Sequence, residues 1–301
     1  MGELYIIAGE EGAGKTAVCA GLAINLLNVG KKTGYLNLQA KGKSDDTSLM
    51  KQVPGLEIIS SESSPLKGRE IVLAEAGTGK EVGEKAKKLK AKVIIVEAYT
   101  GRRVKSASPY KAFGKSLAGI IVNKVPQRLL KSVKEEVAAK CEAEGIKLLG
   151  VIPEDRVLLA ITVGELAECI GGKVITQAEK SSELVENYML GAMVVGSGLD
   201  YFGRKKNKAA IIRGERLDMQ LAALETPMSC LVLSGTSKPP TYRALLKAED
   251  RGIPIITTKT SVNDIITNIE KTLPKTGLNN EKKLIKIAET VKQNLDIKAL
   301  N

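Results

Sequence analysis

The chain of 301 residues is long enough for about two domains, carries a formal net charge of +12 and contains no histidine. Histidine-based catalysis and histidine metal ligands are therefore excluded, and we expect any metal to bind oxygen ligands, which suits Mg²⁺. No apolar stretch reaches the ~18 residues that a membrane helix needs, the N-terminus lacks a secretory-signal pattern, and the four cysteines are far apart. We expect a cytoplasmic protein without membrane contact.

Residues 9–16 read Gly-Glu-Glu-Gly-Ala-Gly-Lys-Thr, the complete G-x-x-x-x-G-K-T pattern of a phosphate-binding loop (P-loop). A predicted strand over residues 4–8 precedes it and a predicted helix over residues 15–29 follows it, which is the context that such a loop requires. We expect ATP here, with a solvent-facing Lys15 reaching its β- and γ-phosphates and Thr16 binding Mg²⁺. The residues expected around the nucleotide phosphates are Gly9, Gly12, Ala13, Gly14, Lys15, Thr16 and Ala17.

The rest of the first half alternates between apolar strands and helices. Continuous aliphatic runs such as residues 93–96 are typical of strands buried on both faces, so the pattern predicts an α/β fold with a mostly parallel sheet. The further predicted strands are residues 33–38, 56–59, 70–75, 92–97, 117–123 and 147–152, and the further predicted helices are residues 80–90 and 128–144.

Polar residues at strand ends are candidates for the nucleotide site, because open α/β sheets bind ligands at the carboxyl ends of their strands. Glu75, which precedes a glycine-rich turn, is the favoured Mg²⁺ carboxylate, and Glu97 is the alternative. Asp45 could complete the metal site, or could belong to a solvated acidic loop after the second strand. Asn123 could bind a purine base or simply form a turn. Lys15 and Glu75 are the residues that we expect to serve any catalysis.

A domain boundary is predicted after residue 152, because Pro153 interrupts the regular pattern. A second boundary is predicted near Pro274, where a polar stretch leads to a final helix over residues 281–295. The predicted regions are a P-loop nucleotide-binding domain over residues 1–152, a smaller domain over residues 153–273 and a C-terminal helical tail over residues 274–301.

The second region shows its own alternation of strands and helices, which predicts a small Rossmann-like α/β domain. Thr162 and Glu165 near its start have the spacing of a capping box. The predicted elements are strands at residues 208–212, 230–234 and 253–257 and helices near residues 216–225, 241–250 and 261–271.

Polar loops follow the strands of this second domain. Arg216, Gly235, Thr236 and Lys259 lie in these loops and together predict a pocket for a small anionic metabolite. The alternative is that they form ordinary turns rich in helix N-cap residues.

The motifs resemble known families. The P-loop, residues 35–38, residues 73–77 and residues 122–125 are similar in order to the motifs of dethiobiotin synthetase-like and cobyrinate amidoligase-like P-loop proteins. The later motifs resemble a DRTGG domain. The combination resembles the N-terminal regulatory part of long phosphate acetyltransferases, from about residue 1 to residue 270. The DRTGG-like motifs are residues 149–156, 162–167, 187–193 and 212–224.

This resemblance implies that Glu75 is the strand-end carboxylate and that Asn123 binds adenine. Three departures bear on the activity. Asn37 stands where the ligases carry a substrate-binding lysine, Glu215-Arg216 replaces Asp-Arg, and Ser234-Gly235-Thr236 replaces Thr-Gly-Gly. The sequence ends at Asn301, so we expect no acetyltransferase catalytic domain.

We therefore expect an ATP-binding regulatory homodimer with slow ATP hydrolysis, in which Arg102 or Arg103 could supply a charge to a partner's site. The alternative is an ATP-dependent carboxylate–amine ligase. A DNA-associated ATPase of the ParA type is a third class, suggested by the basic charge, but Glu10 stands where its signature lysine is expected. The lysines are spread along the chain and aromatic residues form only 3% of it, so we do not expect nucleic acid as a partner.

Overall fold

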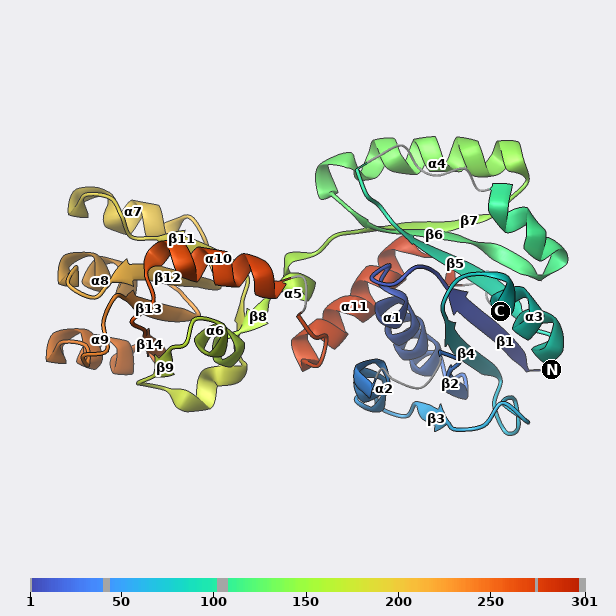
Figure 1. Ribbon diagram of the computed structural model, residues 1–301, viewed down its shortest axis with the longest axis horizontal. Helices are drawn as coiled ribbons and strands as arrows, with labels where there is room; N and C mark the ends of the chain where they lie inside the picture. The colour runs from blue at the N-terminus through green and yellow to red at the C-terminus, as the bar shows by residue number, and fades with distance from the viewer. Residues whose placement is uncertain (1, 40–43, 102–107, 274–275, 298–301) are drawn as a thin grey trace. The chain divides into compact units, whose positions relative to one another are not determined.

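The computed structural model describes residues 2–39, 44–101, 108–273 and 276–297, and it divides the chain into two compact units (Figure 1). The first unit consists of Met1–Leu158 together with Leu278–Asn301, and the second unit is Leu159–Gly277. The limits at residues 158 and 277 lie close to the predicted boundaries after residues 152 and 273, but the segment predicted as a separate tail returns to the first unit.

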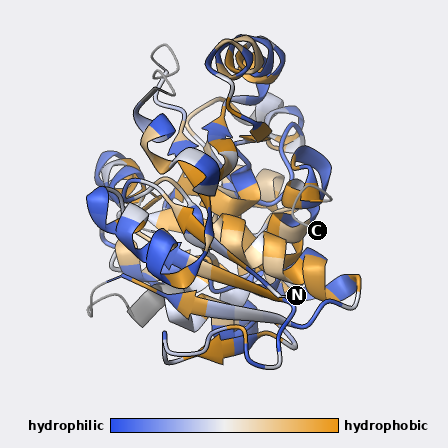
Figure 2. Ribbon diagram, turned by 90° about the vertical axis from the view of Figure 1, so that its right-hand side faces the viewer, coloured by the Kyte–Doolittle hydropathy of each residue, from blue (hydrophilic) through white to orange (hydrophobic). Residues whose placement is uncertain are grey.

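Seven parallel strands form the sheet of the first unit, in the order β3-β2-β4-β1-β5-β6-β7. Side chains of β1 alternate between two hydrophobic clusters, with Tyr5 and Ile7 in one and Leu4 and Ile6 in the other. Burial on both faces explains the aliphatic runs and confirms the predicted α/β class, and Figure 2 shows these strands as predominantly hydrophobic. The strands are β1 (Glu3–Ala8), β2 (Thr33–Asn37), β3 (Glu57–Ile59), β4 (Ile71–Ala76), β5 (Lys92–Ala98), β6 (Leu117–Val125) and β7 (Leu148–Pro153).

Helices cover both faces of this sheet. Helices α1, α2 and α11 contribute to one hydrophobic cluster, and α3 and α4 contribute to the other. The segment that contains Asp45 was expected to be a loop, and this prediction is wrong: it forms helix α2, through which Leu49 and Met50 reach the core. The α-helices are α1 (Lys15–Asn28), α2 (Ser44–Lys51), α3 (Lys80–Leu89), α4 (Leu130–Glu144), α5 (Arg156–Leu159) and α11 (Glu281–Asn294), and the 3₁₀ helices are η1 (Ser108–Ser116) and η2 (Gln127–Leu129).

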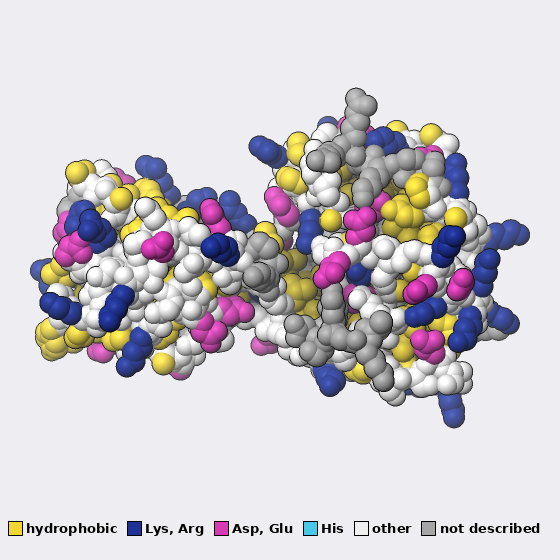
Figure 3. Space-filling model, viewed as in Figure 1, with side chains coloured by type: hydrophobic (Ala, Val, Ile, Leu, Met, Phe, Trp, Pro, Cys, Tyr) yellow, Lys and Arg dark blue, Asp and Glu magenta, His cyan; other side chains and the backbone are white. Residues whose placement is uncertain are grey.

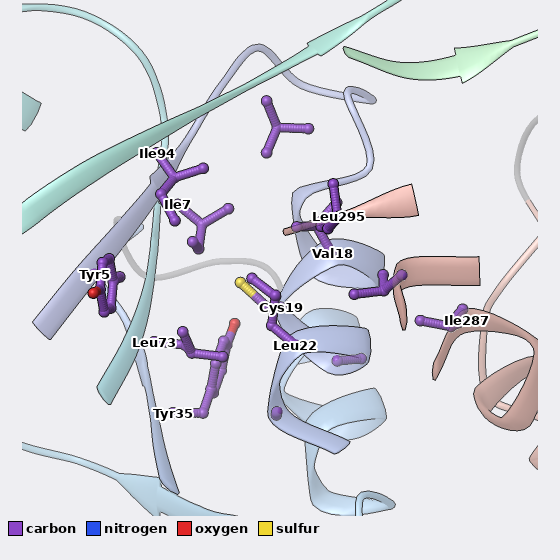
Figure 4. Packing of buried hydrophobic residues seen from close by; sticks show 14 of the residues in the cluster. Tyr5, Ile7, Val18, Cys19, Leu22, Tyr35, Leu73, Ile94, Ile287 and Leu295 are labelled. Atoms are coloured by element: carbon purple, nitrogen blue, oxygen red, sulfur yellow. The ribbon is translucent and has the colours of Figure 1, made fainter. Parts of the chain in front are cut away.

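The C-terminal helix α11 packs against α1, the helix that the P-loop leads into. Gly21 of α1 permits this approach, because a Cβ atom at that position would lie 2.4 Å from the side chain of Val291. The amide of Asn25 donates to the carbonyl oxygen of Ala288 at 2.9 Å. Figure 4 shows Ile287 on the side of α1 that faces away from the sheet. The segment expected as a separate tail is therefore part of the first unit's core.

The second unit contains a five-stranded sheet in the order β11-β12-β13-β14-β9, in which β9 alone pairs in the antiparallel direction. Hydrophobic clusters on both faces bury the central strands, as in the first unit. The strands are β11 (Asn187–Leu190), β12 (Lys208–Arg213), β13 (Cys230–Ser234), β14 (Ile255–Thr257) and β9 (Lys173–Val174), beside a separate antiparallel pair of β8 (Ile161–Thr162) and β10 (Leu184–Val185).

The helices of the second unit confirm the predicted alternation. The capping box at the start of α6 is also confirmed, because the Thr162 hydroxyl accepts from the Glu165 amide at 3.1 Å and the Glu165 carboxylate accepts from the Thr162 amide at 2.7 Å. The helices are α6 (Val163–Cys169), α7 (Gly198–Gly203), α8 (Leu217–Leu224), α9 (Tyr242–Asp250) and α10 (Val262–Thr272), with 3₁₀ helices η3 (Ala178–Ser182) and η4 (Val195–Ser197).

Candidate functional site

The P-loop connects the end of β1 to the start of α1, as the sequence predicts. Gly14 precedes the helix with φ 88° and ψ 26°, a left-handed conformation that glycine adopts without strain. A Cβ atom at Gly14 would lie 2.3 Å from the amide nitrogen of Asn123, and one at Gly9 would lie 2.2 Å from the carbonyl oxygen of Val96. Gly14 is therefore required both by the backbone conformation of the loop and by its close packing on β6, and Gly9 by the close packing on β5.

Lys15 is the first residue of α1 and is only 6% exposed. The expectation of a solvent-facing side chain is wrong, because its ammonium group folds back over the loop and donates to the carbonyl oxygen of Glu10 at 2.9 Å. A buried ammonium at a helix N-terminus, beside glycine backbone, concentrates positive charge at the end of the loop. This arrangement suits a phosphate anion.

Glu75, at the end of β4, is the centre of a hydrogen-bond network. Its carboxylate is 1% exposed and accepts from the Thr16 hydroxyl at 3.0 Å, from the Tyr35 hydroxyl at 3.0 Å and from the Gln39 amide at 3.1 Å. These donors come from α1, β2 and the segment after β2. Charge-assisted hydrogen bonds from three elements hold the carboxylate beside the first turn of α1.

Gln39 and Tyr35 were not predicted as site residues, and Asn37 was noted only as a departure from the ligases. The Asn37 side-chain oxygen accepts from the Gln39 backbone amide at 2.8 Å, which shapes the turn that brings Gln39 to Glu75. The pairing of Asn37 with Glu75 in neighbouring parallel strands places this turn beside the carboxylate. Strand register, which the sequence does not reveal, is therefore what assembles these residues.

The donor set fits Mg²⁺, since the Thr16 hydroxyl and the Glu75 carboxylate place two oxygen atoms side by side. Within the described ranges, no group of three or more histidine, cysteine, aspartate or glutamate side chains is arranged to hold a metal. Asp45 lies in α2, and its side chain lies outside what the structure describes.

Asn123 lies at the end of β6 and contacts the P-loop. Its amide donates to the carbonyl oxygen of Ala13 at 2.9 Å, while its oxygen accepts from the Lys124 backbone amide at 2.8 Å. Lys124 has a φ of 61°, which a residue with a side chain rarely adopts. The residue predicted to bind adenine thus supports the loop in this structure, and its role toward a base stays a prediction.

Glu97, the alternative Mg²⁺ carboxylate, is engaged elsewhere. It lies at the end of β5 and accepts a hydrogen bond from the Tyr110 hydroxyl in η1. Burial and the neighbouring Glu97 raise the pKa of Tyr110, so that the hydroxyl stays protonated as the donor. Both residues line a cavity of about 720 Å³ that extends from the P-loop to α3 and η1.

The predicted ligand residues of the second unit are dispersed. The Arg216 guanidinium binds Asp218 at 2.8 Å and also donates to the carbonyl oxygen of Met193, and the Asp218 carboxylate raises its pKa. Lys259 is exposed. A hollow of about 310 Å³ lies at the strand ends, and of the four predicted residues Gly235 alone lines it. The described residues that line it are Arg213, Glu215, Ser234, Gly235, Ser261, Val262 and Asn263.

The surface offers no concentrated basic area on the face that Figure 3 shows, where Lys and Arg side chains are scattered over both units with acidic side chains between them. Every helix in the described part of the chain is too short or too polar to cross a membrane. Arg102 and Arg103 lie outside the described residues.

Two family models match the chain. Residues 4–165 match the CobQ/CobB/MinD/ParA nucleotide binding domain, and residues 165–272 match the DRTGG domain. A stretch of 166 residues is 22% identical to the phosphate acetyltransferase of Synechocystis sp., and this match covers 52% of the chain and 24% of the relative. The suspected combination of a P-loop domain and a DRTGG domain is therefore confirmed, and the chain spans about a quarter of that relative's length.

Solved structures resemble parts of the chain at low identity. The CBS and DRTGG domains of the regulatory region of Clostridium perfringens pyrophosphatase, complexed with the activator diadenosine tetraphosphate, are 17% identical over 48% of this chain and 74% of theirs, with a TM-score of 0.35. Chloroplast FtsY from Physcomitrella patens is 17% identical over 52% of this chain and 59% of its own, with a TM-score of 0.41.

Proposed function

Because the chain belongs to the CobQ/CobB/MinD/ParA nucleotide binding domain family, we propose that it is a cytoplasmic regulatory protein that binds Mg²⁺ and ATP at the P-loop. The nucleotide state of this domain would control a partner or a conformation, and the DRTGG domain would sense a ligand or form a homodimer. A nucleotide-binding domain joined to a second domain that could bind a ligand supports a regulatory role for the protein. It gives less support to an enzyme that catalyses a single reaction.

The observation that carries this proposal is the contact between Thr16 and Glu75 at the start of α1. Thr16 follows Lys15 in the first turn of α1, and Glu75 reaches this turn from β4, so the ammonium for the terminal phosphates lies close to the two oxygens for Mg²⁺. The Gly9, Gly12, Ala13, Gly14 and Ala17 backbone would surround the phosphates. When bound, Mg²⁺ would neutralise phosphate charge beside this carboxylate.

Slow hydrolysis is part of the proposal. P-loop proteins that lack a positioned water-activating group turn over slowly until a partner completes the site. Glu75 accepts three hydrogen bonds from its own unit. These bonds hold the carboxylate beside Thr16 and make it a weak base toward water. A second copy could complete the site, and Arg102 or Arg103 remains the proposed donor of a positive charge to the partner's phosphates.

The ligase alternative would need a cation where Asn37 stands, and Asn37 instead accepts a hydrogen bond from Gln39. The test is turnover of the purified protein with Mg²⁺ and ATP, alone and with carboxylates plus an amine or bicarbonate. The proposal expects slow ADP release that these substrates leave unchanged. Rapid, substrate-dependent ADP release with a ligated product would replace it with the ligase.

For the second unit we propose a small anionic metabolite in the hollow at the strand ends. Arg213 lines this hollow, whereas Arg216 does not. Each arginine is paired with an acidic side chain at 2.8 Å, Arg213 with Glu215 and Arg216 with Asp218, so an anion in the hollow would compete with Glu215 for Arg213. Gly235 has a φ of 70° and contributes backbone to the wall. Thr236 and Lys259 would contribute from the neighbouring loops.

A further inference from the structure

The cavity of about 720 Å³ beside the P-loop is large enough for a drug-sized small molecule. It lies at the carboxyl ends of β1 and β5, with α3 on one side and η1 on the other. Much of its wall is apolar. The apolar side chains that line it are Ala8, Ala13, Val82, Ala86, Ile95, Val96, Ala98, Pro109, Ala112, Phe113 and Val122.

Aromatic side chains are concentrated in this wall. The whole chain has seven tyrosines, two phenylalanines and no tryptophan, and three of these nine, Tyr99, Tyr110 and Phe113, line the cavity. Because the chain has so few aromatic residues, we take three of them in one wall as an indication of a binding site. Aromatic faces bind organic cations, because the negative face of the ring attracts positive charge.

The charges of the side chains that line the cavity also favour a cationic ligand. The described residues that line the cavity include four glutamates, at positions 10, 11, 84 and 97, and two lysines, at positions 80 and 87. Among the described residues, the wall therefore carries two more acidic than basic side chains, in a chain whose net charge is +12. The Tyr110 hydroxyl donates to Glu97, which holds this carboxylate beside one of the three aromatic side chains of the wall.

The cavity also adjoins the end of the P-loop where Lys15 lies. The Lys15 ammonium donates to the carbonyl oxygen of Glu10, and Glu10 and Gly12 both line the cavity. Thr78 and Gly79, which follow β4 shortly after Glu75, line it from the other side. A molecule in the cavity would therefore lie next to the terminal phosphate of a nucleotide in the loop.

We propose that this cavity binds an organic cation with an apolar body, such as a primary alkyl- or arylalkylamine, with its ammonium group between Glu97 and the aromatic side chains. The inference goes beyond nucleotide binding and does not require it. A bound amine would link the nucleotide site to a second small molecule within the same unit.

The test uses two probes of similar shape and opposite charge, 2-phenylethylamine and 3-phenylpropanoate, titrated into the full chain and followed by ligand-observed NMR. Titrations are run with and without Mg²⁺ and ADP. We expect the amine to bind at least tenfold more tightly than the carboxylate. Glu97→Gln should weaken amine binding at least fivefold, and Glu142→Gln, on α4 and outside the cavity wall, should leave it unchanged.

Equal or tighter binding of the carboxylate, or amine binding that Glu97→Gln leaves intact, overturns the proposal. Absence of amine binding at 10 mM probe also overturns it. Nucleotide affinity is measured on the same samples. Amine binding without nucleotide binding would refute the proposed function and leave this inference standing, and the reverse result would refute the inference alone.

Discussion

The two units have similar parallel sheets, but the polar residues at their strand ends are engaged in different ways. In the first unit, Glu75 accepts hydrogen bonds from Thr16 and Gln39, which come from different elements. In the second unit, Arg216 at the N-cap of α8 binds Asp218 in the first turn of that helix, and it also donates to the carbonyl oxygen of Met193. The carboxylate of the first unit is buried and takes its donors from three elements, whereas the ion pair of the second unit is partly exposed and joins residues two positions apart.

This difference indicates how to distinguish a site from a set of polar turns. Ordering side chains from several elements around one buried carboxylate costs conformational entropy and desolvation. We therefore expect such a cluster mainly at functional sites. Solvent-exposed ion pairs between residues close in sequence contribute little to the free energy of unfolding. The contrast supports the proposal that the first unit binds the nucleotide and that the second unit has a ligand-sensing or contact role.

Removal of the C-terminal segment should have the largest effect on stability, and it should affect the first unit but not the second. Residues 1–158 without α11 should fail to fold cooperatively, because Leu284, Ile287, Val291 and Leu295 of the C-terminal segment are buried in its core. At about 1.5–3 kcal/mol for each side chain, the loss of about 6–12 kcal/mol matches the whole stability of a typical domain. Circular dichroism with urea unfolding measures this.

The controls for this truncation are two further fragments. Residues 159–277 should unfold cooperatively alone, and residues 1–158 joined by a flexible linker to residues 278–301 should recover the fold. A cooperative transition of residues 1–158 alone, at the urea midpoint of the rejoined fragment, would show that α11 is dispensable.

Gly21→Ala should destabilise the first unit by about 2 kcal/mol, since the new Cβ would meet Val291 and overpacked cores lose about 1–3 kcal/mol. Gly83→Ala in α3 is the matched control. Its Cβ would lie 3.8 Å from Phe113, which is an ordinary contact distance. The higher helix propensity of alanine should therefore raise the free energy of unfolding by about 0.5–1 kcal/mol. Denaturant unfolding of both variants checks the ranking, and equal effects would contradict the described packing of α1 on α11.

Glu75→Gln should weaken Mg²⁺-dependent ATP binding about tenfold, equivalent to about 1.4 kcal/mol, because it removes the charge of the carboxylate that we propose for Mg²⁺. Glu97→Gln should change it less than twofold, since Glu97 accepts from Tyr110 in the neighbouring cavity. Calorimetric titrations over a series of Mg²⁺ concentrations make the comparison. The opposite order would transfer the metal role to Glu97.

The smallest effect concerns Lys208, a fully buried cation of the second unit that donates to the carbonyl oxygens of Lys205 and Pro227. Burial lowers its pKa to about 8, so the unfolded chain, with a pKa near ~10.4, binds more protons above pH 8. Stability should therefore rise by about 1 kcal/mol between pH 8 and pH 9, relative to Lys208→Met. Urea unfolding of both proteins gives this difference. A fall in the free energy of unfolding from pH 8 to pH 9, relative to Lys208→Met, would refute the lowered pKa of Lys208.

The local features of the fold were predictable from the sequence. Continuous aliphatic runs predicted the parallel strands, and the Gly-rich loop between strand and helix predicted the P-loop. Helix α2 was missed because its polar first turn conceals Leu49 and Met50. The packing of α11 on α1 depends on Gly21, whose role appears only when the two helices meet.

The candidate site was predictable only where a local sequence pattern marks the residue. Lys15 and Thr16 follow from the pattern, and Glu75 follows from its place at a strand end. Gln39 and Tyr35 could not be predicted, because the register of β2 beside β4 brings them to the carboxylate. Residues separated by long stretches of chain meet through sheet order, which local patterns do not encode.

The central claim is that the P-loop of the first unit binds Mg²⁺ and ATP through Lys15. The most direct measurement is calorimetric titration of ATP with Mg²⁺ into the wild-type chain, Lys15→Ala and the control Lys140→Ala on α4. The account predicts saturable binding that Lys140→Ala retains and Lys15→Ala weakens about 100-fold or more, equivalent to about 2.7 kcal/mol. Unchanged affinity in a folded Lys15→Ala variant, or no binding to the wild type, would contradict it.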